Sequence, residues 1–192
     1  MILTLPDAWS PVFCREVRTA MDRGSATPAE IFDGDFIVDR RVRDVLEVDV
    51  EAGMCAAVEA RIAAVREQVA SFFALPLAGS EGPSFLRYRA GGFYRRHRDC
   101  AGTGAGTDDR RVSLVIFLNG VSAGSAGEGF AGGSLRLYPD GPLREDSNAL
   151  AEEPAIDIVP REGLLVAFPA DMPHEVLAVA RGVRDAVVDW YW

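Results

Sequence analysis

Short β-prone segments, separated by glycine, proline and acidic residues, occupy the chain from residue 84 to its C-terminus. This pattern predicts an antiparallel β domain. Eight short strands with irregular connections favour a jelly roll, because two facing sheets leave few exposed edges. The expected strands are 84–89, 93–99, 111–119, 133–139, 155–160, 163–169, 174–179 and 183–192.

The first eighty residues have a different pattern. Apolar residues recur every four positions from Trp9 to Met21, and a second apolar stripe runs from Ala52 to about Phe73, where Pro76 ends it. We expect two amphipathic helices there, with strands between them over residues 31–50. The second stripe consists of Val58, Ile62, Val65, Val69 and Phe72. With no linker or repeat in the chain, we expect one domain over 1–192, in which 1–80 support a β core over 81–192.

Charge and composition exclude several classes of protein. Lys and Arg total 20 and Asp and Glu total 29, a net charge of −9, which disfavours nucleic acid as a partner. No apolar run approaches the roughly 20 residues that cross a bilayer, and no signal peptide is evident, so we expect no membrane association. Cys14, Cys55 and Cys100 form no CxxC pair, which favours the cytoplasm over an oxidising compartment.

Only two histidines are present, His97 and His174. On a strand, His97 and Asp99 would project to the same face, whereas Arg98 would point away. His174 begins a later β-prone segment after a proline-bounded turn, and we take it as the third candidate ligand. Two imidazoles and one carboxylate on one face of a metal are the ligand set of non-heme Fe(II) oxygenases, although zinc enzymes use similar ligands.

Arg184 distinguishes between these metals. It shares one face of the last segment with Ala186, Val188 and Trp190. Burial of a guanidinium without an anion is costly, and a bound dicarboxylate would supply the anion through two parallel hydrogen bonds. The alternative is an arginine at the rim, paired with an acidic side chain.

Several ordered motifs resemble the 2-oxoglutarate and Fe(II)-dependent dioxygenases of prolyl 4-hydroxylase type. The similarity runs from about Phe85 to Trp192, and a weaker similarity extends into the helices expected before it. YRAGGFYRRHRD resembles that family's tyrosine, glycine and HxD signature, and RRVSLVIFLN and FAGGSLRLYP resemble the strands that follow it. LLVAFPADMPHEVLAVARGVRDAVVDWYW is similar to its closing stretch. The resemblance implies a double-stranded β-helix, the cupin-like form of the jelly roll.

The resemblance also implies roles for individual residues. His97, Asp99 and His174 would hold Fe(II), and Arg184 would bind the C5 carboxylate of 2-oxoglutarate. With O2, and with ascorbate as a stimulating reductant, the enzyme would convert 2-oxoglutarate to succinate and CO2 while hydroxylating an unactivated C–H bond. The pattern departs from the family at Phe117, where many hypoxia-sensing-type prolyl hydroxylases carry a tyrosine. Tyr88 and Tyr94 are the candidates to supply the missing hydroxyl group, and Trp190 is a candidate pocket residue. Arg181 also lies near the expected basic position and ranks behind Arg184.

The substrate is less well defined. The resemblance implies a prolyl or other peptidyl side chain, and Arg40, Arg41 and Arg43 either attract an acidic peptide or form a solvated face. Alternatives are a hydroxylase of a free amino acid or natural-product intermediate, and a non-catalytic sensor that keeps the metal site. A zinc hydrolase has less support because no HExxH is present. Loss of the metal carboxylate would be needed for halogenation, and Asp99 is present.

Overall fold

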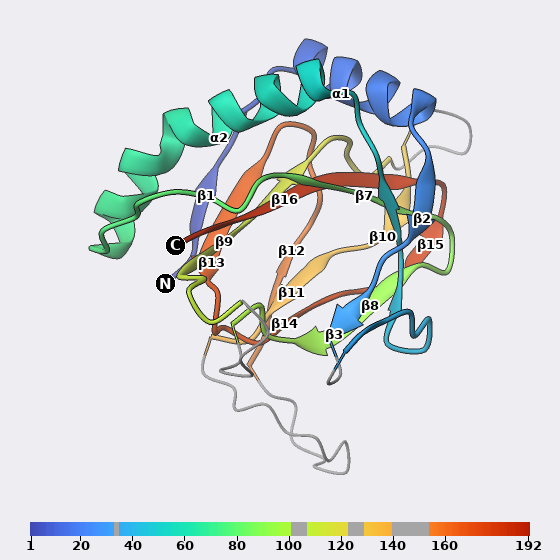
Figure 1. Ribbon diagram of the computed structural model, residues 1–192. Coiled ribbons are helices and arrows are strands. Elements are labelled where there is room, and N and C mark those ends of the chain that lie inside the picture. The colour runs from blue at the N-terminus through green and yellow to red at the C-terminus, as the bar shows by residue number, and fades with distance from the viewer. Residues whose placement is uncertain (33–34, 101–106, 123–128, 140–153) are drawn as a thin grey trace.

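The computed structural model describes residues 1–32, 35–100, 107–122, 129–139 and 154–192. Two antiparallel sheets face each other in the jelly roll (Figure 1). The larger sheet has seven strands, in the order β1 (Leu3–Leu5), β13 (Leu165–Pro169), β9 (Val112–Phe117), β16 (Arg184–Tyr191), β7 (Ser84–Tyr88), β6 (Leu46–Val48) and β2 (Ala26–Pro28). The smaller sheet has five, in the order β12 (Ile156–Ile158), β11 (Leu135–Leu137), β14 (His174–Val176), β8 (Phe93–His97) and β5 (Arg43–Asp44). Two short pairs complete the β structure, β3 (Ile31–Phe32) with β4 (Phe36–Ile37), and β10 (Ala131–Gly132) with β15 (Val179–Arg181).

Helices α1 (Pro11–Arg23) and α2 (Ala52–Phe73) cover the outer face of the larger sheet (Figure 1). Helix α1 begins where the Ser10 side chain accepts a hydrogen bond from the Phe13 N–H and Pro11 takes the first helical position. Helix α2 ends at Ala74, whose backbone is left-handed. Neither helix has the length and apolarity that a membrane crossing requires.

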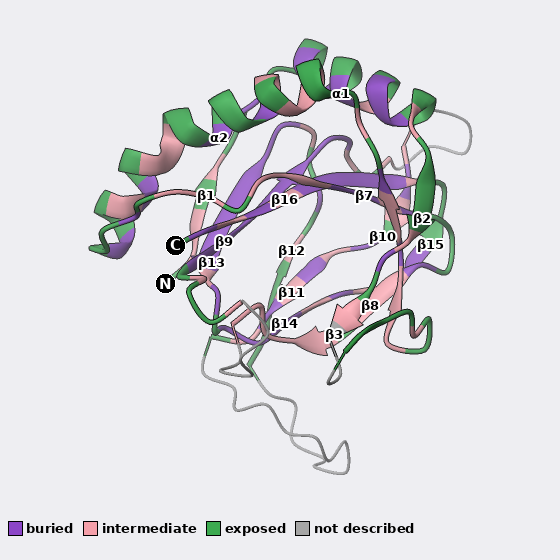
Figure 2. Cartoon of the chain, in the orientation of Figure 1, coloured by how far each residue is buried: buried purple, intermediate pink, exposed green. Residues whose placement is uncertain are grey.

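The larger sheet is buried on both faces (Figure 2). Along β16, Val187 and Tyr191 pack in the cluster that includes both helices, and Ala186 packs in the cluster between the sheets. This alternation follows from the period of two in a strand. The residues between the sheets therefore face the interior of the jelly roll, where side chains from β7, β9 and β16 can meet those of β8 and β14.

The architecture confirms the predicted fold and all eight predicted strands, with differences in detail. The strand predicted at 93–99 ends at His97, so Asp99 lies beyond β8. Strands β1, β2, β10 and β15 are additional, because their two or three residues give no detectable periodicity. In α2 the last stripe residue, Phe72, is exposed, and Phe73 is buried in its place.

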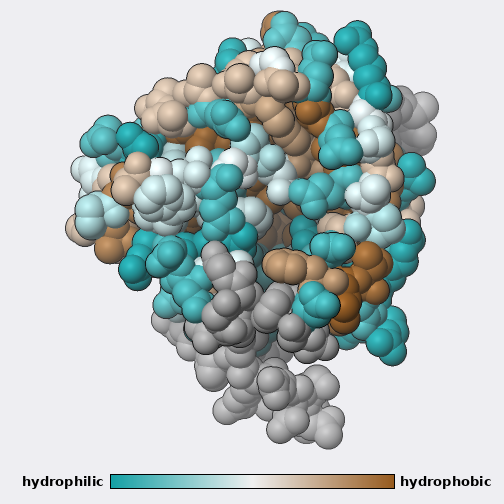
Figure 3. Space-filling model, in the orientation of Figure 1, coloured by the Kyte–Doolittle hydropathy of each residue, from teal (hydrophilic) through white to brown (hydrophobic). Residues whose placement is uncertain are grey.

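The face of the molecule shown in Figure 3 is largely hydrophilic. Hydrophobic atoms gather at the lower right of the face shown, in the region of β3 and the segment after it (Figure 3). Phe36 and Ile37 of β4 and the following Val38 are exposed. Residues 33–34, 101–106, 123–128 and 140–153 lie outside the described residues.

Candidate active site

Two imidazoles meet across neighbouring strands of the smaller sheet. His97 is the last residue of β8 and His174 the first of β14, and the two are directly paired in the antiparallel register. Their ring centroids are 4.1 Å apart. Phe168 contacts His174 edge-on at 4.7 Å, and the Tyr94 ring stacks on His97 at 3.5 Å. The aromatic neighbours thus restrict both rings.

Asp99 joins the two histidines from just beyond β8. Its Oδ1 lies 3.5 Å from Nε2 of His97, and its Oδ2 lies 3.4 Å from Nε2 of His174. The backbone N–H of Asp99 donates to the Ala170 carbonyl at 2.9 Å, and the Ser113 hydroxyl donates to Oδ2 at 2.6 Å. One ligand atom from each of the three side chains lies within 4.8 Å of the others. This is the only such group of metal-binding type among the described residues.

Hydrogen bonds to carbonyl groups determine which nitrogen of each imidazole carries the proton. Nδ1 of His97 lies 2.8 Å from the Arg95 carbonyl, and Nδ1 of His174 lies 2.9 Å from the Met172 carbonyl. A carbonyl oxygen only accepts, so Nδ1 is the donor in both rings. In the neutral rings the Nε2 lone pairs are therefore free, and Nε2 is the atom that faces Asp99.

The protonation states also suit a metal. Burial, and after it the nearby His97, lower the pKa of His174 to about 4. Asp99 raises this pKa, but by less than His97 lowers it. For Asp99, burial favours a higher pKa, but His174, His97 and the Ser113 hydroxyl together hold the pKa well below its usual range. At neutral pH the site therefore offers a neutral His174 and an ionised carboxylate, the forms that bind metal ions.

Arg184 lies at the start of β16, directly opposite Tyr88 of β7. It is 1% exposed, and its guanidinium carbon lies 4.7 Å from the centroid of the Tyr88 ring and 5.0 Å from that of Phe117. Burial lowers the pKa of Arg184, although Tyr88 and Asp185 oppose the effect. Among the described residues, its Nε has no acceptor and its guanidinium makes no salt bridge. The alternative of a rim arginine paired with an acid is therefore wrong.

One cleft between the sheets contains the histidines, Asp99 and Arg184. Its volume is about 440 Å³, counted with the space at its mouth. Tyr88, Tyr94 and Trp190, all candidates from the sequence, line it. Its remaining lining residues are Arg43, Leu86, Leu114, Val115, Leu135, Val176 and Val188.

Two other candidates do not line this cleft. Phe117 is fully buried in the core between the sheets and contributes only the apolar ring near the guanidinium of Arg184. Arg181, expected near the pocket, is exposed on β15, and its Nη2 donates to the Ser122 carbonyl at 2.8 Å. Arg181 ends β15, three residues before Arg184 begins β16, and its place near the pocket stays a prediction.

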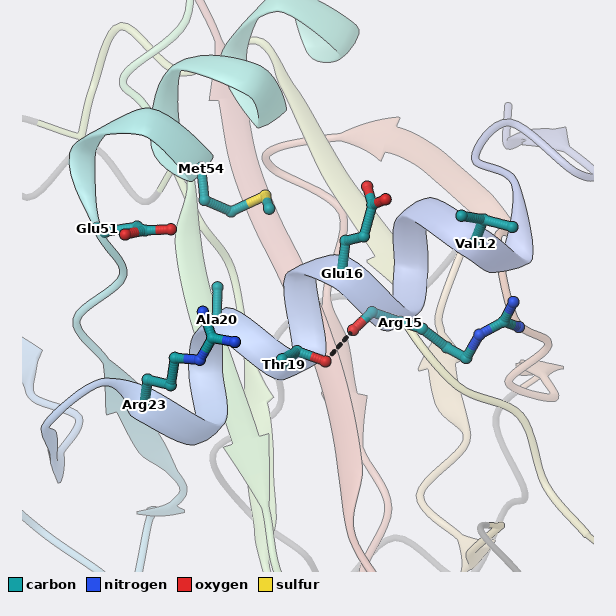
Figure 4. Close-up of a pocket in the computed structure, with 8 residues that line it drawn as sticks. All are labelled: Val12, Arg15, Glu16, Thr19, Ala20, Arg23, Glu51 and Met54. Carbon is teal, nitrogen blue, oxygen red and sulfur yellow. Dashed lines mark hydrogen bonds between the residues drawn. The ribbon is translucent and has the colours of Figure 1, made fainter.

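A second hollow lies on the other side of the larger sheet, between α1 and the start of α2 (Figure 4). The side chains around it are Val12, Arg15, Glu16, Thr19, Ala20, Arg23, Glu51 and Met54. It contains no imidazole or thiol, and the Thr19 hydroxyl is already bonded to the Arg15 carbonyl at 2.8 Å. The hollow therefore has no evident chemistry.

Three residues that the sequence did not place at the site contribute to it. Ser113 is the one hydroxyl in the apolar run of β9, and that isolated polar residue was a signal that could have been used. Arg43 was expected either to attract an acidic peptide or to belong to a solvated face, and it lines the cleft. Arg110 lies 3.7 Å from the centroid of the Trp190 ring and forms a salt bridge with Glu81 at 2.6 Å, so it braces that wall.

The arrangement suits a divalent metal together with an anionic co-ligand. Two Nε2 lone pairs and one carboxylate can bind on one face of a metal and leave its other positions open. In the same cleft, the unpartnered Nε of Arg184 requires an acceptor from outside the described residues. A dicarboxylate with one end at the metal would provide it, so the residues present fit both Fe(II) and 2-oxoglutarate.

Comparisons with known proteins point the same way. The chain superimposes on a prolyl-4-hydroxylase of Pseudomonas putida with 24% identity and a TM-score of 0.72, covering 99% of this chain and 91% of that one. A prolyl hydroxylase of Trichoplax adhaerens, in complex with a hypoxia-inducible factor peptide, gives 19% identity, a TM-score of 0.73 and coverage of 100% and 83%. The viral collagen prolyl hydroxylase of Paramecium bursaria Chlorella virus-1, as a 2-oxoglutarate complex, gives 16%, 0.65 and coverage of 99% and 94%. These likenesses show the fold.

No curated protein matches this chain. The model of the 2OG-Fe(II) oxygenase superfamily, however, matches residues 83–192, more than half of the sequence. That match covers all three members of the histidine and aspartate group, together with Arg184. The chain therefore belongs to the 2OG-Fe(II) oxygenase superfamily and is a dioxygenase that uses Fe(II), 2-oxoglutarate and O2.

Proposed function

We propose that His97, Asp99 and His174 hold the Fe(II), that Arg184 binds the distal carboxylate of 2-oxoglutarate, and that Tyr88 lies beside that carboxylate. The observation that carries this proposal is the convergence of three ligand atoms within 4.8 Å in the same cleft as a buried guanidinium whose Nε has no acceptor among the described residues.

The residues of the chain position the reactants. Bound Fe(II) would supply the oxidation that couples conversion of 2-oxoglutarate and O2 to succinate and CO2 with hydroxylation of a C–H bond. The carbonyl-bonded Nδ1 atoms keep both imidazoles in the tautomer that offers Nε2, and Ser113 restrains the carboxylate. Arg184 would fix the far end of the co-substrate by a forked, charge-assisted pair. The apolar walls around it exclude water, which strengthens that pair.

For the substrate, we propose a prolyl or other peptidyl side chain. The support is the fold likeness to prolyl hydroxylases, one of which is in complex with a peptide. The cleft opens between the sheets and has both an aromatic wall, at Tyr94 and Trp190, and aliphatic walls. Such a surface suits a ring or chain with unactivated C–H bonds.

We also propose that residues 1–192 act as one domain in the cytoplasm. The core cluster that contains side chains from both helices and from the larger sheet supports a single unit. The three cysteines are all free thiols, in keeping with a reducing compartment.

Iron binding by matched variants tests the ligand assignment. Asp99→Ala should lose Fe(II), measured as metal retained after anaerobic desalting. Glu175→Ala is the control, because Glu175 follows His174 directly but its carboxylate accepts a hydrogen bond from Tyr138 at 2.5 Å, outside the cleft. Equal retention by the two variants would refute the assignment. For the substrate, proline-containing peptides incubated with the holoenzyme should gain one oxygen atom by mass spectrometry.

A further inference from the structure

Three arginines close together in the sequence have different surroundings. Nη1 of Arg40 lies 3.4 Å from Oδ1 of Asp44, and Nη2 of Arg41 lies 2.8 Å from Oδ2 of Asp39. Arg43 has no carboxylate partner within salt-bridge distance in the part of the chain that the structure describes. The interpretation of a solvated, internally paired face therefore suits the first two arginines and not the third.

Arg43 is held at the cleft that contains the iron ligands. Strand β5 pairs with β8 so that Arg43 lies opposite Tyr94, and its guanidinium carbon is 4.8 Å from the centroid of the Tyr94 ring. That ring stacks in turn on His97 at 3.5 Å. Nη1 of Arg43 donates to the Glu30 carbonyl at 2.6 Å, which fixes the guanidinium in place. One aromatic ring thus separates this cation from the metal ligands.

The guanidinium of Arg43 still requires an acceptor. Its Nε is buried and has no hydrogen-bond partner among the described residues. A buried donor left unsatisfied costs free energy, and a cation near apolar walls costs more. A carboxylate would satisfy both the donor and the charge, because a guanidinium presents paired N–H groups that match its two oxygens.

The charge balance of the cleft indicates where that carboxylate comes from. The guanidinium groups that line it belong to Arg43 and Arg184, and the carboxylate that lines it is Asp99, which is assigned to the metal together with the two histidines. The assignment of Arg184 to 2-oxoglutarate leaves Arg43 as the cation without a counter-ion.

We propose that Arg43 is the substrate-selecting residue and binds a carboxylate carried by the substrate. The enzyme then prefers an anionic substrate over its neutral isostere. This inference rests on the proposed function and specifies its substrate class. The carboxylate is either the free acid of a small amino-acid-like molecule or the side chain of an acidic residue in a peptide.

Two matched pairs of compounds test the proposal and separate the two sources. The first pair is N-acetylproline and N-acetylprolinamide, and the second is the blocked peptides Ac-Ala-Pro-Asp-Ala-NH2 and Ac-Ala-Pro-Asn-Ala-NH2. For each pair, the readout is the ratio of kcat/KM for the acid to that for the amide, from succinate formed by the holoenzyme. A ratio within one variant cancels any general loss of activity.

We expect the wild-type enzyme to favour the acid by about tenfold or more in at least one pair, as for a charge-assisted hydrogen bond. Arg43→Gln should reduce the ratio to about one, and Arg43→Lys should retain part of it because the charge remains without the fork. Arg41→Gln is the control and should keep the wild-type ratio, since Arg41 is exposed and already paired with Asp39. Selectivity in the first pair indicates a small acid, and selectivity in the second indicates an acidic peptide.

A wild-type ratio of about one in both pairs would overturn the proposal, as would an unchanged ratio in Arg43→Gln. Absence of succinate above the substrate-free rate with all four compounds is a different result. It would contradict the proposed prolyl substrate, and the inference about Arg43 would be withdrawn with it.

Discussion

Replacing Arg184 with methionine should make the protein more stable when 2-oxoglutarate is absent. The side chain is fully buried, its Nε has no acceptor among the described residues, and burial opposes its charge. An unsatisfied buried donor costs about 1–3 kcal/mol, while the contacts with the Tyr88 and Phe117 rings return about 1 kcal/mol. Methionine removes the charge and keeps most of the apolar volume. We therefore expect the free energy of unfolding to rise by about 1 kcal/mol or more.

The stability advantage of Arg184→Met over wild type should become smaller when 2-oxoglutarate is bound. At 100 times its dissociation constant, a ligand stabilises the native state by about 2.7 kcal/mol. Loss of a charged hydrogen bond, about 1.5–3 kcal/mol, weakens binding roughly 10- to 150-fold. At the same ligand concentration, Arg184→Met would then gain only about 0.3–1.4 kcal/mol. The advantage of the variant should shrink or disappear.

Urea unfolding under anaerobic conditions with Fe(II), with and without 2-oxoglutarate, measures both effects through the fluorescence of the three tryptophans. Arg181→Met is the control, because this exposed residue should change either free energy by less than about 0.5 kcal/mol. If Arg184→Met is less stable than wild type by more than about 1 kcal/mol without 2-oxoglutarate, the guanidinium is satisfied within the chain. The argument for a waiting anion site would then be wrong.

Further predictions concern the residues around the site. Ser113→Ala removes the 2.6 Å hydrogen bond to Asp99 and should raise the Kd for Fe(II) about tenfold in an anaerobic titration. Ser113→Thr keeps a hydroxyl group and should restore the wild-type Kd. An unchanged Kd in the alanine variant would contradict a supporting role for Ser113. Gly133→Ala should weaken 2-oxoglutarate binding and lower the Tm, because its φ is +66° and an added Cβ would lie 2.9 Å from Cδ of Arg184; wild-type affinity and Tm would show that the space is available. Cys14 is buried and its pKa is raised to about 11, so iodoacetamide at pH 8 should modify it only after unfolding, as followed by mass spectrometry, and rapid labelling of the native protein would contradict its burial.

The β segments were predictable because their hydrophobic patterns agree with the faces they bury. The alternation along β16, for example, places Arg184 on the inner face and Asp185 on the outer one, where it pairs with Arg18 and Arg87. The HxD spacing likewise indicated that His97 and Asp99 converge. Alternation along a strand explains this convergence only in part, because Asp99 lies beyond the end of β8.

What could not be predicted depends on partners distant in the sequence. Asp99 is held by Ala170 and Ser113, and no local pattern identifies either contact. The difference between Arg41, which is paired, and Arg43, which lines the cleft, arises from the pairing of β5 with β8. Strand pairing of this kind is a property of the whole fold, so the run of arginines alone was ambiguous.

The central claim is that one cleft holds Fe(II) through the two histidines and Asp99 and holds 2-oxoglutarate through Arg184. The most direct test is an anaerobic titration of the Fe(II)-loaded protein with 2-oxoglutarate, monitored by the visible metal-to-ligand charge-transfer absorption that a chelated 2-oxo acid produces. We predict that the band forms in wild type, fails to form in Asp99→Ala, and requires at least about tenfold more 2-oxoglutarate in Arg184→Met. Fe(II) binding without any band in wild type would contradict the account.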